Sequence, residues 1–113
     1  TQAGRVRLGL NEFILVLNFL GSRIMNEAAF REQLQQNGYG EGVIKEMAAN
    51  YHEDTHTHDF GASIMVLSGK ISVTLEDGRV ETCEAGDTFA LDANIPHTEQ
   101  VGPDGVRFLV GRK

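Results

Sequence analysis

Three of the four histidines in this sequence have types and spacing that suit a shared metal ion. His56 and His58 are one residue apart, and in an extended strand such side chains leave the same face about 7 Å apart. Neutral imidazole is a common protein ligand for zinc, iron, copper and nickel. A third imidazole, that of His97, would complete one face of a coordination sphere if another strand brought it close. A His-x-His pair alone also fits two surface histidines beside a turn, so the pattern leaves both interpretations open.

The residues around these histidines resemble the two sequence motifs of the cupin superfamily. The stretch His56 to Gly69 reads HTHDFGASIMVLSG and is similar to the first motif, in which a His-x-His pair precedes a glutamate and then a glycine. The stretch Gly86 to His97 reads GDTFALDANIPH and is similar to the second motif. The 16 residues between the two stretches match the short spacing of small single-domain bacterial cupins. The resemblance covers roughly residues 40 to 112 and implies an all-β fold, a double-stranded β-helix or jelly-roll barrel, with the motif residues at one end.

The sequence departs from the family's pattern at two places. Ala62 stands where the family carries a metal-binding glutamate, and an alanine side chain cannot ligate a metal. Asp92 and Asn94 stand where the second motif carries proline and glycine, and both residue types accept turn geometry.

The resemblance therefore implies three metal ligands, His56, His58 and His97, and leaves the fourth open. The cofactor it implies is a divalent iron, zinc, nickel or manganese ion, since ligand type alone does not choose among these metals. Three neutral imidazoles would leave the charge of the ion unbalanced, which favours an anionic ligand at an open position. Some members of the superfamily, including three-histidine dioxygenases, work without the glutamate.

Three further residues are candidates for a chemical role. Glu99 lies two residues after His97, on the same strand face and about 7 Å along it. It is a candidate general base, or a partner of the site through a hydrogen bond or a water, with a solvated glutamate as the alternative. His52 is about 13 Å from His56 along a strand, so we expect a hydrogen-bonded surface histidine. Cys83 lies between acidic neighbours in an expected strand, and we expect inert packing.

Strand parity also predicts a mainly apolar pocket beside the histidines. The candidate lining residues share the parity of the first motif or come from the second, and are Phe60, Ala62, Ile64, Val66, Phe89 and Leu91. Plain core packing is the alternative for all six.

The elements that position these residues are visible as one helical and several strand patterns. Residues 27 to 37 predict a short helix, with Asn26 as its cap, Phe30 and Leu34 on its apolar face, and Gly38 after its end. From about residue 42 onward, short runs of Val, Ile, Leu, Thr and Phe alternate with glycine-bearing turns, which is typical of a sandwich or barrel.

Three turns divide the strand region. Asp77 and Gly78 predict a two-residue hairpin turn, followed by a strand through Cys83. Further turns are expected at residues 85–87 and at residues 102–105, and a last strand is expected at residues 106–110.

The first 24 residues are expected to be an extension or a strand that pairs across a dimer, and residues 25–113 a single cupin domain. The apolar run from Phe13 to Leu20 would invite association if its edge were left uncovered. We therefore expect a homodimer, which sedimentation would test. Met25 is a candidate natural start.

Length and composition fit one globular domain of 113 residues. The formal net charge of −6 repels phosphate backbones and anionic lipid surfaces, so neither nucleic acid nor a membrane is an expected partner. The single cysteine cannot form an internal disulfide, which makes the cytoplasm the default compartment.

Together these features predict a small metal-binding cupin that acts on a small organic, anionic ligand through a three-histidine site. An oxygenase or an isomerase would fit. The alternative is a non-catalytic cupin module that binds or senses a small molecule, and the fold cannot decide between them.

Overall fold

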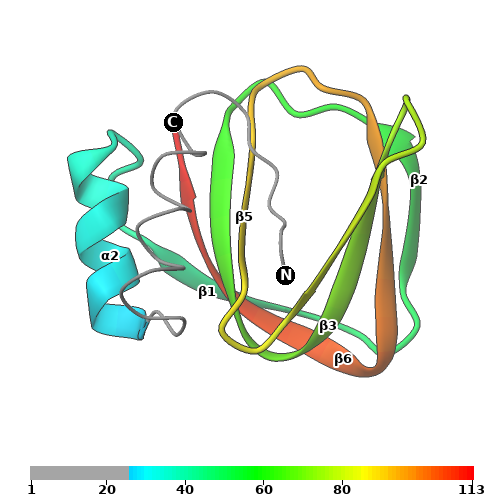
Figure 1. Cartoon of the computed structure of the whole chain (residues 1–113), viewed down its shortest axis with the longest axis horizontal. Helices are drawn as coiled ribbons and strands as arrows, with labels where there is room; N and C mark the ends of the chain where they lie inside the picture. Colours follow the sequence, from blue (N-terminus) through cyan, green and yellow to red (C-terminus); the bar gives the residue numbers. More distant parts are fainter. Residues whose placement is uncertain (1–25) are drawn as a thin grey trace.

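The computed structural model describes residues 26–113, which form one helix and six strands (Figure 1). The elements are α2 (Glu27–Gln36), β1 (Val43–Met47), β2 (His52–His56), β3 (Ala62–Leu75), β4 (Val80–Glu84), β5 (Thr88–Leu91) and β6 (His97–Arg112). The expected pairing strand at residues 13–20 lies outside the described residues, so its role stays a prediction.

Two long strands, β3 and β6, pair antiparallel along their whole lengths and form the frame of the barrel. The first half of β3 also pairs with β5, and the second half of β6 also pairs with β1. The second half of β3 pairs with β4, and the first half of β6 pairs with β2. Each long strand therefore belongs to both four-stranded layers, and the predicted all-β jelly-roll barrel is confirmed.

Gly69 and Gly105 form the corner at which β3 and β6 pass from one layer to the other. The β3–β6 register shifts on either side of this point, between Val66 and Ser68 and between Gly69 and Ile71. Both glycines have positive φ, +80° and +78°. A Cβ on Gly69 would lie 2.0 Å from the carbonyl oxygen of Gly105, so no side chain fits there.

The turn expected at residues 102–105 does not separate two strands, because β6 runs through it. The segment bends β6 but does not end it, because β6 pairs with β3 on both sides of the bend.

The β3–β4 hairpin also differs from the prediction. Gly78 is left-handed with φ +93°, but Asp77 is not, so a two-residue turn with positive φ at both positions is excluded. The loop has three residues, 76–78, closed by a bond of 3.0 Å from the Gly78 N–H to the Leu75 carbonyl. The Asp77 carboxylate accepts hydrogen bonds from the backbone N–H and the Nε of Arg79, which fixes this form of the loop. The turn expected at residues 85–87 is confirmed, with Gly86 at φ +91°.

Helix α2, which the sequence pattern predicted, lies against the outside of the barrel (Figure 1). The Asn26 side chain accepts a hydrogen bond of 2.8 Å from the Ala29 N–H and caps the helix. Phe30 and Leu34 are fully buried against Met65 of β3 and Leu109 of β6. This outer cluster explains why neighbouring β3 and β6 residues are apolar on both faces.

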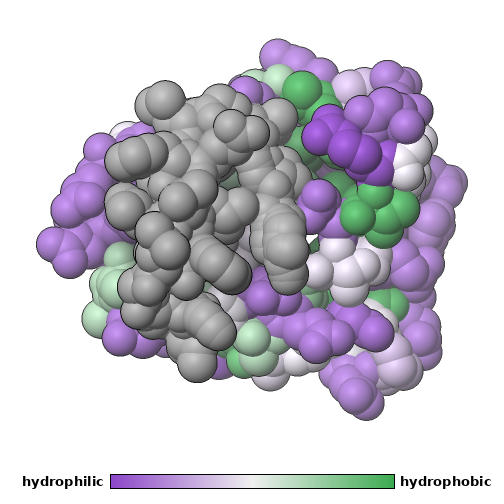
Figure 2. Space-filling model, in the orientation of Figure 1, coloured by the Kyte–Doolittle hydropathy of each residue, from purple (hydrophilic) through white to green (hydrophobic). Residues whose placement is uncertain are grey.

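The main core fills the inside of the barrel and includes Cys83, which is buried among apolar side chains as expected. Outside it, a few large hydrophobic residues stay exposed, among them Val43 and Val80. Where Figure 2 shows the described residues, hydrophobic side chains form small patches among hydrophilic ones. Within residues 26–113, no helix has the length and apolar character to cross a bilayer.

Candidate metal centre

The three histidines come from two strand ends and one loop at the same end of the barrel. His56 is the last residue of β2 and pairs directly with His97, the first residue of β6. His58 lies in the loop after β2, where its carbonyl accepts a hydrogen bond of 2.7 Å from the Asn94 N–H. Asn94 has a φ of +65°, the left-handed turn geometry that asparagine tolerates. The two motif segments are thus tied together next to the site.

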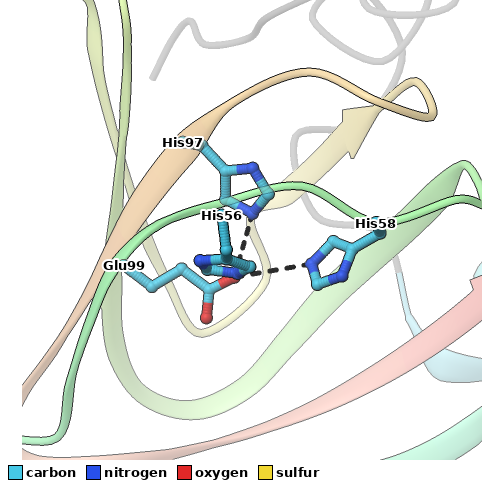
Figure 3. A group of neighbouring side chains, drawn as sticks. All are labelled: His56, His58, His97 and Glu99. Atoms are coloured by element: carbon cyan, nitrogen blue, oxygen red, sulfur yellow. Dashed lines mark hydrogen bonds and ion pairs between the residues drawn. The ribbon is translucent and has the colours of Figure 1, made fainter.

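The side chains of His56, His58, His97 and Glu99 converge on one point (Figure 3). One ligand atom from each residue lies within 4.8 Å of every other. The three imidazole centroids are 4.4 to 5.1 Å apart. Such a set of nitrogen and oxygen donors is compact enough for one ion to contact all four.

Backbone carbonyls set the orientation of two of the rings. The Nδ1 of His56 lies 2.7 Å from the Asp54 carbonyl oxygen, and the Nδ1 of His97 lies 2.8 Å from that of Ile95. A carbonyl oxygen only accepts, so each Nδ1 carries a proton and donates it. The Nε2 atom of each ring then faces the centre. Without a bound ion, the Nε2 of His97 carries a proton and donates it to the Glu99 carboxylate, and a metal ion would take the place of that proton.

Glu99 places a carboxylate next to the three imidazoles. Its Oε2 lies 3.2 Å from the Nε2 of His97, 3.3 Å from that of His56 and 3.9 Å from that of His58. The sequence placed Glu99 on the correct strand face but about 7 Å along the strand, at hydrogen-bond or water distance from the site. The glutamate side chain is long enough to reach back across that spacing, so its carboxylate lies directly among the imidazoles.

Burial and mutual hydrogen bonds shift the pKa values of three of these side chains from their usual values. The hydrogen bond from His97 is the main reason that the pKa of Glu99 lies below its usual value. Burial alone would lower the pKa of His97, but the hydrogen bonds to Glu99 and to the Ile95 carbonyl raise it overall. Burial, helped by the neighbouring histidines, lowers the pKa of His58 and favours its neutral form. A partly buried carboxylate beside three imidazoles favours a cation at the centre.

His52 does not belong to this group. Its Nδ1 lies 3.1 Å from the side-chain oxygen of Gln100, and its Nε2 lies 3.0 Å from the Asp54 carboxylate. Half of its side chain is exposed. The predicted hydrogen-bonded surface histidine is confirmed.

A cavity of about 270 Å³ adjoins the metal-ligand group, and its wall includes His58, His97 and Glu99. Five of the side chains expected from parity line it, and these are Phe60, Ala62, Ile64, Phe89 and Leu91. Val66 is not among the lining residues. It lies directly before the first register shift of β3 and is fully buried in the barrel core, because the strand bends away from the cavity there.

The lining also includes residues that sequence reasoning did not find. Ile71, Val73 and Phe108 extend the apolar wall, while Lys45, Glu46 and Arg112 add charge. Arg112 is directly opposite Ala62 in the β3–β6 register. Nothing near residue 112 in the sequence signals this position, because it depends on how two distant strands pair.

The sequence matches the model of the cupin domain family over residues 43–110. The chain belongs to this family. None of the curated proteins compared with the sequence matches it.

Solved structures share the cupin fold with this chain. A structure of DMSP lyases has a TM-score of 0.58 and 22% identity, and the match covers 65% of this chain and 37% of that chain. An RmlC-like cupin from Shewanella frigidimarina has a TM-score of 0.54 and 21% identity, covering 64% of this chain and 63% of that chain. The oxalate decarboxylase of Lactobacillus farciminis, in a formate complex, has a TM-score of 0.55 and 26% identity, covering 64% of this chain and 22% of that chain. This cupin thus spans less than two thirds of the length of each.

Proposed function

We propose that this cupin binds a divalent metal ion through His56, His58, His97 and Glu99 and holds a small organic ligand in the adjoining cavity. The observation that carries the proposal is the convergence of four ligand atoms within 4.8 Å of one another. The Nδ1 hydrogen bonds of His56 and His97 support it, because they direct both Nε2 atoms toward the same point.

The donor set is three imidazole nitrogens and one carboxylate oxygen, which fits iron, manganese, nickel or zinc. The cupin pattern takes its carboxylate from the position of Ala62 on β3, whereas this chain would take it from Glu99 on β6. As a ligand, Glu99 would balance part of the charge of the ion. We therefore favour a ligand role for Glu99 over the role of general base that the sequence suggested.

A metal ion at this site would polarise a bound ligand as a Lewis acid or, if it were iron, take part in oxygen chemistry. The protein itself would orient the ligand and exclude water through the apolar wall of the cavity. Two structural neighbours are named as a lyase and as a decarboxylase, so proteins that share this fold include enzymes. We favour an enzyme, with oxygenase or isomerase chemistry, over a module that only binds or senses.

Metal analysis tests this proposal. Protein purified without an affinity tag or chelator would be incubated with each candidate ion, desalted, and analysed by plasma mass spectrometry. We expect near-stoichiometric metal in the wild type and a loss of metal in a His56→Ala, His97→Ala double variant.

His52→Ala is the matched control, because it removes a histidine from the same strand without touching the cluster. It should bind metal as the wild type does. Equal, trace metal in all three proteins would remove the metal site and leave a metal-free binding barrel. If metal is bound, its identity directs the activity test: oxygen uptake for iron, and proton-transfer or hydrolysis screens for the others.

A further inference from the structure

Arg112 places an available positive charge on the cavity wall. Its guanidinium Cζ lies 4.4 Å from the centre of the Phe60 ring. No carboxylate within residues 26–113 forms an ion pair with it, whereas Glu46 is paired with Arg107 at 3.3 Å and Glu99 lies among the histidines. With respect to the part of the chain that the structure describes, the guanidinium therefore keeps its hydrogen-bond donors available for a ligand.

The backbone fixes this position close to the candidate metal centre. Gly61 and Lys113 exchange two backbone hydrogen bonds, of 2.8 and 2.9 Å, next to the Ala62–Arg112 pair. The Phe60 ring, over which the Arg112 guanidinium lies, also stacks on the His58 imidazole, with 4.9 Å between centroids and 19° between planes. Two ring contacts thus connect the cation to a metal-ligand candidate.

Ala62 leaves open the space in front of this cation. Directly opposite residues of an antiparallel pair share a face, and both Ala62 and Arg112 line the cavity. A glutamate at position 62, as in the cupin pattern, would put a carboxylate beside the guanidinium. The alanine side chain supplies none.

We infer that the cavity binds a small amphipathic monocarboxylate, whose carboxylate pairs with Arg112 and whose apolar body packs against Ile64, Phe89 and Leu91. The inference rests on the proposed function, in that it takes this cavity as the ligand site. A guanidinium presents paired N–H donors that match the two oxygens of a carboxylate.

The remaining charges on the wall favour one negative charge on the ligand over several. Lys45 adds a second cation to the lining, but Glu46 and Glu99 are also present. The net charge of the whole chain is −6, which opposes a polyanion. The apolar wall favours a ligand that buries hydrocarbon surface over a small bare anion.

The experiment measures benzoate binding to the metal-free full-length chain by NMR titration, with benzamide and acetate as reference probes. Benzamide keeps the ring and removes the charge, and acetate keeps the charge and removes the ring. We expect benzoate to bind roughly tenfold or more tightly than either probe, because it alone makes both kinds of contact.

Arg112→Gln should remove the preference for benzoate over benzamide, and Arg112→Lys should keep part of it. Arg79→Gln is the matched control: this arginine is exposed, it is paired with Asp77, and neither residue lies on the cavity wall. It should bind benzoate as the wild type does. Ala62→Glu should weaken benzoate binding more than Ala62→Gln, since an internal carboxylate would compete for Arg112.

The outcomes separate this inference from the metal proposal. Benzoate binding that depends on Arg112 in a protein that takes up no metal would support the inference and overturn the metal site. Benzoate binding that appears only after metal loading and is unchanged in Arg112→Gln would overturn the inference, because the carboxylate would then bind the metal. Equal affinity for benzoate and benzamide in the wild type would also overturn it.

Discussion

Glu99 has the largest influence on what the candidate metal centre can bind. Without it, three neutral imidazoles would face the ion, and the ligand would have to supply all negative charge. With it, a carboxylate that is only 17% exposed already lies 3.2 to 3.9 Å from the three Nε2 atoms. Glu99 then balances part of the charge of the ion, so the preference of the cavity for an anionic ligand depends more on Arg112 than on the ion.

We expect Glu99→Gln to lower metal affinity roughly 10- to 100-fold, a range typical of losing a group that supports a metal site. Glutamine keeps the shape of the side chain but removes the charge that attracts the ion. Isothermal titration with the metal found in the wild type measures the change. Glu53→Gln, on β2 opposite Glu99, is the control and should lower the affinity far less, because Glu53 affects His97 only through its charge. An affinity of Glu99→Gln equal to that of the wild type would show that Glu99 is not a ligand.

At this scale, the sequence predicted the convergence of His56, His58 and His97, since their motif spacing carries that information. It also placed Glu99 on the correct face, because parity along a strand is local. It did not predict the direct reach of the Glu99 carboxylate, which depends on side-chain conformation. Arg112 was not found at all, because its place opposite Ala62 follows from a pairing between strands about 50 residues apart in the chain.

Among the elements, the corner of β3 and β6 sets the shape of the barrel and hence of the site. Gly69→Ala should destabilise the protein strongly, by about 3 kcal/mol or more, since it combines a positive φ with a steric clash against the Gly105 backbone. Urea unfolding measures the loss.

Gly78→Ala separates the cost of the positive φ from the cost of the steric clash. Gly78 also has a positive φ, but a Cβ there would meet nothing within 4 Å. We expect a loss of only about 1 kcal/mol for this variant. Equal losses in the two variants would mean that the close contact at the corner contributes nothing.

The cap of α2 is a second element that can be tested alone. Asn26→Ala should lower the free energy of unfolding by about 1 kcal/mol, because the Ala29 N–H loses its acceptor. Asn37→Ala is the comparison, since Asn37 takes part at the other end of the helix through its backbone. Urea unfolding of both variants should show the larger loss for Asn26→Ala, and the reverse order would contradict the capping role.

Sequence patterns predicted this helix well and the strand corners poorly. Cap residues and an apolar face act within a few residues, so α2 could be read from residues 26–38. The segment at 102–105 has the composition of a turn, yet β6 continues through it because β3 supplies partners on both sides. The Asp77 side chain likewise selects a three-residue loop through its bonds to Arg79, which the dipeptide alone does not reveal.

For the molecule as a whole, the homodimer stays a prediction that rests on residues 13–20. Sedimentation of the full chain at micromolar concentration should show a dimer. A variant with Leu15 and Leu17 changed to lysine should shift the protein toward the monomer, because charge on an edge strand opposes pairing. A monomeric wild type would remove the prediction.

Metal binding should stabilise the whole barrel, because the four candidate ligands come from β2, from the loop after it and from β6, which are brought together only by folding. An ion that binds the folded state alone, present at a hundred times its dissociation constant, adds about 2.7 kcal/mol to the free energy of unfolding. For a domain of this size we expect the melting temperature to rise by roughly 10 °C.

Thermal unfolding with and without the ion measures this rise, and two variants assign it. His52→Ala should show the full rise, since His52 lies outside the cluster. His97→Ala should show little or none, because its imidazole is buried at the centre of the cluster, and only 2% of the side chain is exposed. A rise of equal size in His97→Ala would mean that the ion stabilises the protein from another site. In that case the four converging side chains would form a hydrogen-bonded structural cluster, and the cavity would bind its ligand without a metal.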